Sequence, residues 1–123
     1  MKFICEKISI TEEVFGCSIT FAEKENGIAK EHVTVDELHH NTGQYLMLMR
    51  KYREDDFEED YLYLETDNPN KSGELANFLI NIQPHRFSIS YDRDSIEIEM
   101  KPDEQKLKAI KQIIKKITGK IDL

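Results

Sequence analysis

Apolar and polar residues alternate along most of the chain, which is the period-two pattern of strands with one buried face. The most regular stretch is residues 15–21, whose predicted buried face consists of Phe15, Cys17, Ile19 and Phe21. Residues 2–10 are also rich in strand-forming residues, and residues 11–13 predict a turn between the two stretches. We therefore expect the chain to begin with a β-hairpin.

Residues 44–52, QYLMLMRKY, are apolar at both odd and even positions. This pattern is typical of a central strand that is covered on both faces. The stretch YLYLE at residues 61–65 has the same two-sided character. The two stretches predict a hairpin whose loop is the acidic run between them.

Two further stretches predict three strands in the second half of the chain. Residues 76–83, ANFLINIQ, form one strand, and residues 86–100, RFSISYDRDSIEIEM, form a hairpin. Six apolar residues of this hairpin share one face if the strands pair as follows: Phe87 with Met100, Ile89 with Ile98, and Tyr91 with Ile96. Such a hairpin packs against the rest of the fold on one side only.

The last segment has the 3.6-residue period of an amphipathic helix. Its apolar stripe is Leu107, Ile110, Ile113, Ile114 and Ile117. Pro102 is predicted at the first helical position, and Gly119 is a suitable C-terminal stop. A second, short helix is expected near residues 34–41, because Thr34 and Glu37 form a capping box.

These elements predict a single α+β domain over residues 1–123. It consists of a mostly antiparallel sheet of about six to seven strands, with the C-terminal amphipathic helix packed on one face. The length suits one domain with its own core.

The charge is uneven along the chain. Residues 1–100 carry 10 basic and 21 acidic residues, whereas residues 101–123 carry 7 and 3, for a net charge of −7. An acidic surface repels nucleic acid and anionic membranes and attracts basic proteins. Two cysteines, Cys5 and Cys17, are too few for a disulfide scaffold, so a cytoplasmic protein with buried thiols is expected.

Residue patterns for catalysis and cofactor binding are absent from the sequence. There is no nucleophile elbow and no glycine-rich phosphate loop, and we expect neither an enzyme nor a cofactor. A metal site would draw on His32, Asp36, His39 and His40. On one continuous helix, His32, Asp36 and either His39 or His40 would lie on the same side. The cap at Thr34 places His32 before the helix, so the three side chains do not share a face, and surface histidines are the better interpretation.

The acidic run is the main candidate for a partner-binding site. It contains six carboxylates and one aromatic residue and is flanked by two tyrosines: Tyr52, Glu54, Asp55, Asp56, Phe57, Glu58, Glu59, Asp60 and Tyr61. A solvated hairpin tip is one interpretation, and a calcium loop is another, although the spaced aspartates and the glycine of such a loop are missing. The third is a docking surface, in which a basic partner relieves the repulsion and the aromatic rings act as apolar anchors.

Residues 44–117 resemble the immunity-protein-ten family of bacterial polymorphic toxin systems. The resemblance is carried by a strand that ends in a basic residue, an aspartate-rich turn, and a tyrosine-bearing strand that ends in an acid. The matching positions are Arg50, Asp55, Asp56, Tyr63 and Glu65. The resemblance implies a non-catalytic antidote that binds a cognate toxin.

We therefore expect an immunity protein that neutralises a cognate, basic toxin by direct contact in the bacterial cytoplasm. It would be a monomer or a homodimer and would bind neither nucleic acid nor membrane. The alternative is a non-catalytic adaptor or structural subunit that forms a homo-oligomer through an exposed edge strand.

Overall fold

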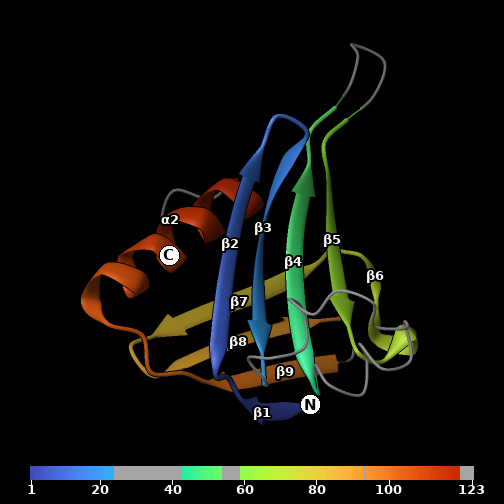
Figure 1. The fold of residues 1–123 in the computed structure, drawn as a ribbon. Coiled ribbons are helices and arrows are strands. Elements are labelled where there is room, and N and C mark those ends of the chain that lie inside the picture. Colours follow the sequence, from blue (N-terminus) through green and yellow to red (C-terminus); the bar gives the residue numbers. More distant parts are fainter. Residues whose placement is uncertain (24–42, 54–58, 93, 120–123) are drawn as a thin grey trace, which may run out of the picture.

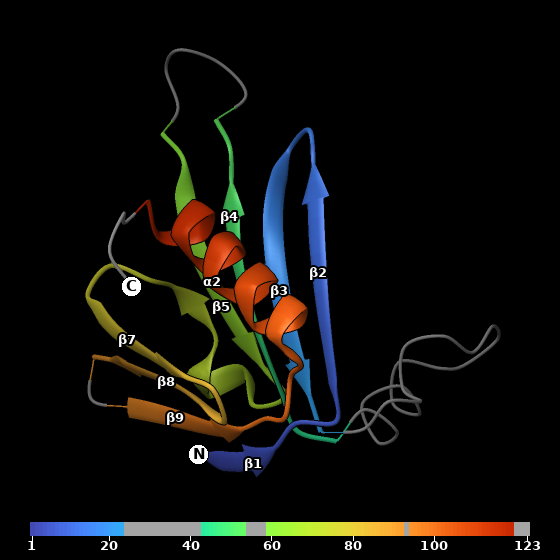
Figure 2. The same cartoon turned by 90° about the vertical axis from the view of Figure 1, so that its left-hand side faces the viewer.

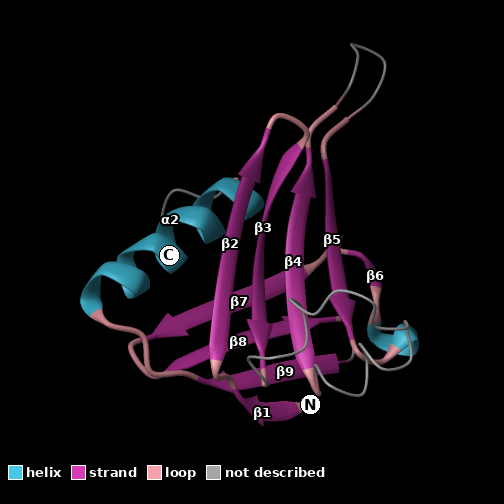
Figure 3. Ribbon diagram, viewed as in Figure 1, coloured by secondary structure: helices cyan, strands magenta, loops and turns pink. Residues whose placement is uncertain are grey.

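The computed structural model describes residues 1–23, 43–53, 59–92 and 94–119. The described residues form nine strands, a 3-10 turn and one helix (Figures 1 and 3). In chain order these elements are β1 (Lys2–Ile4), β2 (Lys7–Glu13), β3 (Gly16–Ala22), β4 (Tyr45–Lys51), β5 (Tyr61–Thr66), η2 (Pro69–Lys71), β6 (Gly73–Glu74), β7 (Phe78–Gln83), β8 (Arg86–Tyr91), β9 (Asp94–Glu99) and α2 (Glu104–Thr118).

The larger sheet is antiparallel, with the strand order β2-β3-β4-β5-β6. Ile19 stands opposite Leu48, and Leu48 stands opposite Leu64, so apolar residues of successive strands share one face. All three side chains are fully buried. The smaller sheet has the order β1-β9-β8-β7, and its strands run across those of the larger sheet (Figure 1).

One core lies between the larger sheet and the elements that cover its apolar face. The rings of Phe21 in β3 and Phe87 in β8 stack with centroids 4.6 Å apart, which joins the two sheets. Helix α2 packs against β3 and β4 on the same face (Figure 2). Its buried residues, Ile110, Ile113, Ile114 and Ile117, come from the predicted apolar stripe.

The α+β class with a C-terminal helix is confirmed, whereas the predicted strand count of about six to seven is too low, because the strands divide between two sheets. The short helix expected near residues 34–41 lies outside the described residues. None of the helices in the described ranges has the length and apolarity needed to cross a membrane.

The predicted first hairpin is wrong in its first strand and in its turn. Residues 2–10 divide into β1, which pairs in parallel with β9, and β2, which pairs with β3. The chain passes between sheets at Cys5 and Glu6, whose N–H groups donate to the carbonyls of Glu99 and Ala22, both at 2.8 Å. Strand β2 then continues through residues 11–13, where a turn was expected.

The predicted register of the last hairpin is also wrong, by two residues. Phe87 pairs with Ile98 rather than with Met100, and Tyr91 pairs with Asp94. The cause is a tight turn, in which Asp92 takes a left-handed conformation with φ 49°. Because side chains alternate with period two, a shift of two residues leaves the apolar face unchanged.

The helix starts slightly later than predicted. Asp103 is its N-cap, with a side chain that accepts a hydrogen bond from the Lys106 N–H at 2.7 Å, and Pro102 precedes the cap. At the other end Gly119 has φ 70°, a left-handed conformation that suits glycine.

Candidate docking surface at the loop end of the larger sheet

At one end of the larger sheet, the turn between β2 and β3 lies beside the end of β4, where the acidic run of the sequence begins (Figure 1). The N–H of Tyr52 donates to the carbonyl oxygen of Phe15 at 2.8 Å, which joins the turn to the residue that follows β4. The acidic run therefore begins beside the β2–β3 turn.

The β2–β3 turn presents two apolar side chains to solvent. Val14 is 88% exposed and Phe15 is 65% exposed. Phe15 was predicted on the buried face with Cys17, but β3 begins at Gly16 and Phe15 belongs to the turn. A Cβ atom on Gly16 would lie 2.3 Å from the Arg50 carbonyl oxygen, so this close approach of two strands requires glycine.

Asp60, at the other end of the acidic run, is bonded within the protein. Its carboxylate accepts from the Arg53 N–H at 2.8 Å and from Nε of Arg50 at 3.0 Å. These two contacts hold the pKa of Asp60 below its ordinary value. Asp60 therefore contributes hydrogen bonds to the fold as well as negative charge to the acidic run.

Arg50 links this connection to the helix. Its Nη1 donates to the carbonyl oxygen of Ile117 at 3.1 Å, in the last turn of α2. The last carbonyls of a helix lack intrahelical partners and carry partial negative charge, so a guanidinium satisfies them well. Lys116 adds a second link, with its ammonium 3.1 Å from the Glu12 carboxylate in β2.

The other predicted partner-binding residues differ in exposure. Tyr52 is half-buried against the core, and a hydrogen bond with the Cys17 side chain raises the pKa of its hydroxyl. Glu59 is exposed, and Tyr61 is 38% exposed with the Lys51 ammonium 5.8 Å from its ring centroid. The remaining predicted residues, Glu54, Asp55, Asp56, Phe57 and Glu58, lie outside the described ranges.

Two positions of the family resemblance lie on the outward face of β5. Tyr63 stands opposite Met49, and Glu65 stands opposite Met47, on the face away from the core. Glu65 also accepts a hydrogen bond from the Tyr45 hydroxyl at 3.1 Å. Burial, with the nearby Glu65 charge, raises the pKa of Tyr45 to about 12.

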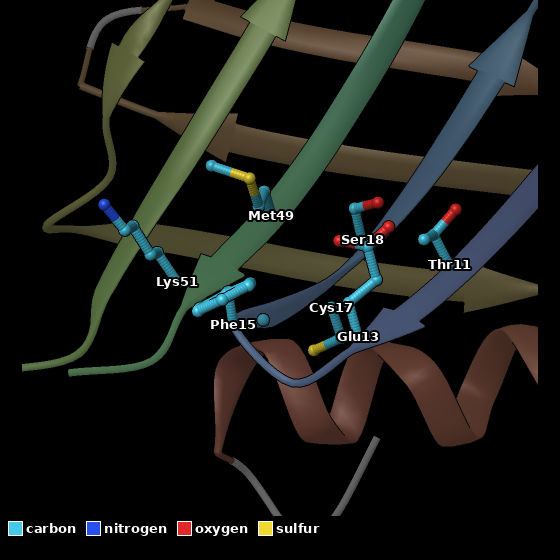
Figure 4. Close-up of a pocket in the computed structure, with 8 residues that line it drawn as sticks. Thr11, Glu13, Phe15, Cys17, Ser18, Met49 and Lys51 are labelled. Carbon is cyan, nitrogen blue, oxygen red and sulfur yellow. The ribbon is translucent and has the colours of Figure 1, made fainter. Parts of the chain in front are cut away.

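A crevice of about 220 Å³ opens on this outward face, next to the β2–β3 turn. We call it the hairpin crevice. Figure 4 shows its lining, which comes from β2, β3, β4 and the turn. The lining residues are Thr11, Glu13, Phe15, Gly16, Cys17, Ser18, Met49 and Lys51.

Sequence reasoning missed Val14, Phe15 and the crevice. A signal was present in the sequence: Glu12 interrupts the apolar alternation of Ile8 and Ile10, so the buried face of β2 ends before the turn. Gly16 then follows two apolar residues, and an isolated glycine at a strand end often marks a close backbone approach. Together these features predict a turn at residues 14–15.

A larger hollow of about 780 Å³ lies near the start of the chain and includes Cys5. Burial raises the pKa of the Cys5 thiol to about 11, and the thiol donates to the Lys7 carbonyl at 3.1 Å. Its thiolate is therefore scarce at neutral pH, which argues against a nucleophile here. Both cysteines are free thiols, and Cys17 is buried as predicted, whereas Cys5 is only partly buried.

The metal hypothesis concerns residues that the structure does not describe. His32, Asp36, His39 and His40 all fall within residues 24–42. Among the described residues, no cluster of three histidine, cysteine, aspartate or glutamate side chains is arranged to hold a metal ion.

No protein-family model matches this chain, and no curated protein matches it either. The resemblance to the immunity family therefore stays a prediction.

Proposed function

We propose that this protein is an immunity protein, which binds a cognate basic toxin and neutralises it by direct contact in the cytoplasm. The observation that supports the proposal most strongly is the position of Val14 and Phe15. They are exposed apolar residues, and the carbonyl oxygen of Phe15 accepts a hydrogen bond from Tyr52, where the acidic run begins. We call residues Glu13, Val14, Phe15, Glu59 and Tyr61 the loop-end surface.

This combination suits a protein interface in physical terms. Burying an exposed phenylalanine ring stabilises a complex by about 2 kcal/mol, so Phe15 can act as an anchor. Carboxylates around such an anchor speed the encounter with a basic partner and favour one orientation. The apolar pair therefore supplies affinity, and the acidic connection supplies selectivity for basic surfaces.

The fold also fixes residues next to the loop-end surface. Arg50 joins β4 to Asp60 and to α2, and Lys116 joins β2 to the same helix. A surface that is ordered before binding loses less conformational entropy when the complex forms. Neutralisation then requires only stoichiometric binding and no reaction.

The experiment that tests the proposal is affinity capture from the source bacterium at low salt, followed by identification of the bound proteins. We expect one basic partner, whose capture falls steeply with added salt. A first variant neutralises Asp55, Asp56, Glu58 and Glu59, and a second carries Val14→Ser and Phe15→Ser. Both variants should lose the partner.

The matched control is Leu79→Ser, because Leu79 is 75% exposed but lies in β7 of the other sheet. This variant should retain the partner. A partner that is captured equally by all variants, or no partner at all, would contradict the proposal.

A homo-oligomeric structural subunit is a second candidate, and β7 is the observation that favours it. This strand is an edge of the smaller sheet, and its six residues carry no charge. Natural edge strands are commonly protected by charged residues or proline, because an unprotected edge pairs with other strands. Sedimentation equilibrium tests this candidate: a concentration-dependent dimer that Leu79→Lys abolishes would support it.

A further inference from the structure

The hairpin crevice is too small for a typical metabolite and has the size of a single side chain. Sites for small molecules usually enclose about 300–1,000 Å³, whereas this crevice encloses about 220 Å³. It also opens at the β2–β3 turn and shares Glu13 and Phe15 with the loop-end surface (Figure 4). The volume of the crevice therefore fits one side chain of a docked protein.

The walls of the crevice combine apolar surface with hydrogen-bond acceptors. Phe15 and Met49 contribute an aromatic ring and a thioether. Thr11 and Ser18 contribute hydroxyl groups, and Glu13 contributes a carboxylate. Figure 4 shows these three polar residues grouped on one side of the crevice.

The charges around the crevice leave Glu13 available for a cation. The neighbouring Glu12 is paired with Lys116 at 3.1 Å, whereas no ion pair engages Glu13 within the part of the chain that the structure describes. The cation that lines the crevice, Lys51, points towards β5 in Figure 4, with its ammonium near the Tyr61 ring. The polar side of the crevice is therefore acceptor-rich and negative.

We propose that the hairpin crevice receives an arginine side chain of the basic partner. The methylene stem of the arginine packs between Phe15 and Met49, and its guanidinium meets the Glu13 carboxylate. The hydroxyls of Thr11 and Ser18 accept its remaining N–H groups. Arginine fits better than lysine, because its flat fork of five donors reaches several acceptors at once.

This inference deepens the proposed function and rests on it for the identity of the partner, but the crevice can be tested alone. The test titrates the isolated, ¹⁵N-labelled protein with N-acetyl-arginine amide and records amide chemical shifts. N-acetyl-citrulline amide, which has nearly the same shape and no charge, is the matched probe. We expect saturable shifts at Thr11, Ser18 and Met49 with arginine, and binding at least tenfold weaker with citrulline.

Two substitutions of exposed carboxylates complete the test. Glu13→Gln should weaken arginine binding at least tenfold, whereas Glu99→Gln, in the smaller sheet, should leave it unchanged. Shifts that are absent, or that persist unchanged in Glu13→Gln, would overturn the inference. Arginine binding without capture of a partner would instead count against the proposed function and leave the crevice assignment standing.

Discussion

The guanidinium of Arg50 donates to the carbonyl oxygen of Ile117 at 3.1 Å, across 67 residues of sequence. The same side chain contacts Asp60 at 3.0 Å. One residue of the central strand thus holds both the end of the helix and the base of the acidic connection.

Replacing Arg50 by alanine should destabilise the protein by about 1–2 kcal/mol, because the carbonyl oxygen of Ile117 loses a charged donor. Chemical denaturation measures this change. Arg86→Ala is the control, since Arg86 forms an exposed ion pair with Glu97 at 3.6 Å, and its replacement should cost less than about 0.5 kcal/mol. Equal effects of the two substitutions would show that the contact with the helix is unimportant.

The lowered pKa of Asp60 predicts a dependence of stability on acid. A carboxyl whose pKa is lower in the folded state stabilises that state above its ordinary pKa of 3.8, and this contribution is lost as pH falls through the folded value. The melting temperature of the wild-type protein should therefore fall more steeply below pH 4 than that of Asp60→Asn. Glu59→Gln should keep the wild-type slope.

Gly16→Ala should destabilise the pairing of β3 with β4, because the new methyl group would lie 2.3 Å from the Arg50 carbonyl oxygen. Relieving that clash requires the two strands to separate, at a cost of about 1–3 kcal/mol. Thermal unfolding measures the loss. Ser18→Ala, on the same strand, is the control and should change the melting temperature little.

Both cysteines should resist alkylation in the native protein. The pKa of Cys5 is raised to about 11, and Cys17 is buried. Because the thiolate is the reactive form, a thiol reagent at pH 7.5 should modify both residues only after addition of denaturant. For Cys5, the native rate should still be rising with pH at pH 9. A rate that levels off near pH 8 would mean that burial does not control this thiol.

The buried faces of the strands and the helix were predictable from sequence, because burial follows a period that side chains reveal. The alternation at Cys17, Ile19 and Phe21 marks the core face of β3, and Ile110 to Ile117 mark that of α2. Register and partner choice were less predictable. Alternation shows which side chains share a face, but it does not show which strands are neighbours. For this reason residues 2–4 were assigned to the first hairpin, whereas β1 pairs with β9.

The burial of β4 was predicted correctly for only one of its two faces. Its two-sided apolar pattern predicted cover on both faces, but only the face with Leu46 and Leu48 is fully buried. Met47 and Met49 are half-buried on the other face. Methionine is common both in cores and at binding surfaces, so its presence does not distinguish the two. Because of this ambiguity, the sequence did not show that Met49 lines a surface crevice.

The parallel pairing of β1 with β9 also constrains the order of folding. Phe3 stands opposite Ile98, so β1 can form its pairing with β9 only after residues 94–99 have left the ribosome. Strands β2 to β5, by contrast, pair with neighbours in sequence and can associate early. The larger sheet, with its loop-end surface, is thus expected to form first, and closure of the smaller sheet by β1 should be a late event in folding.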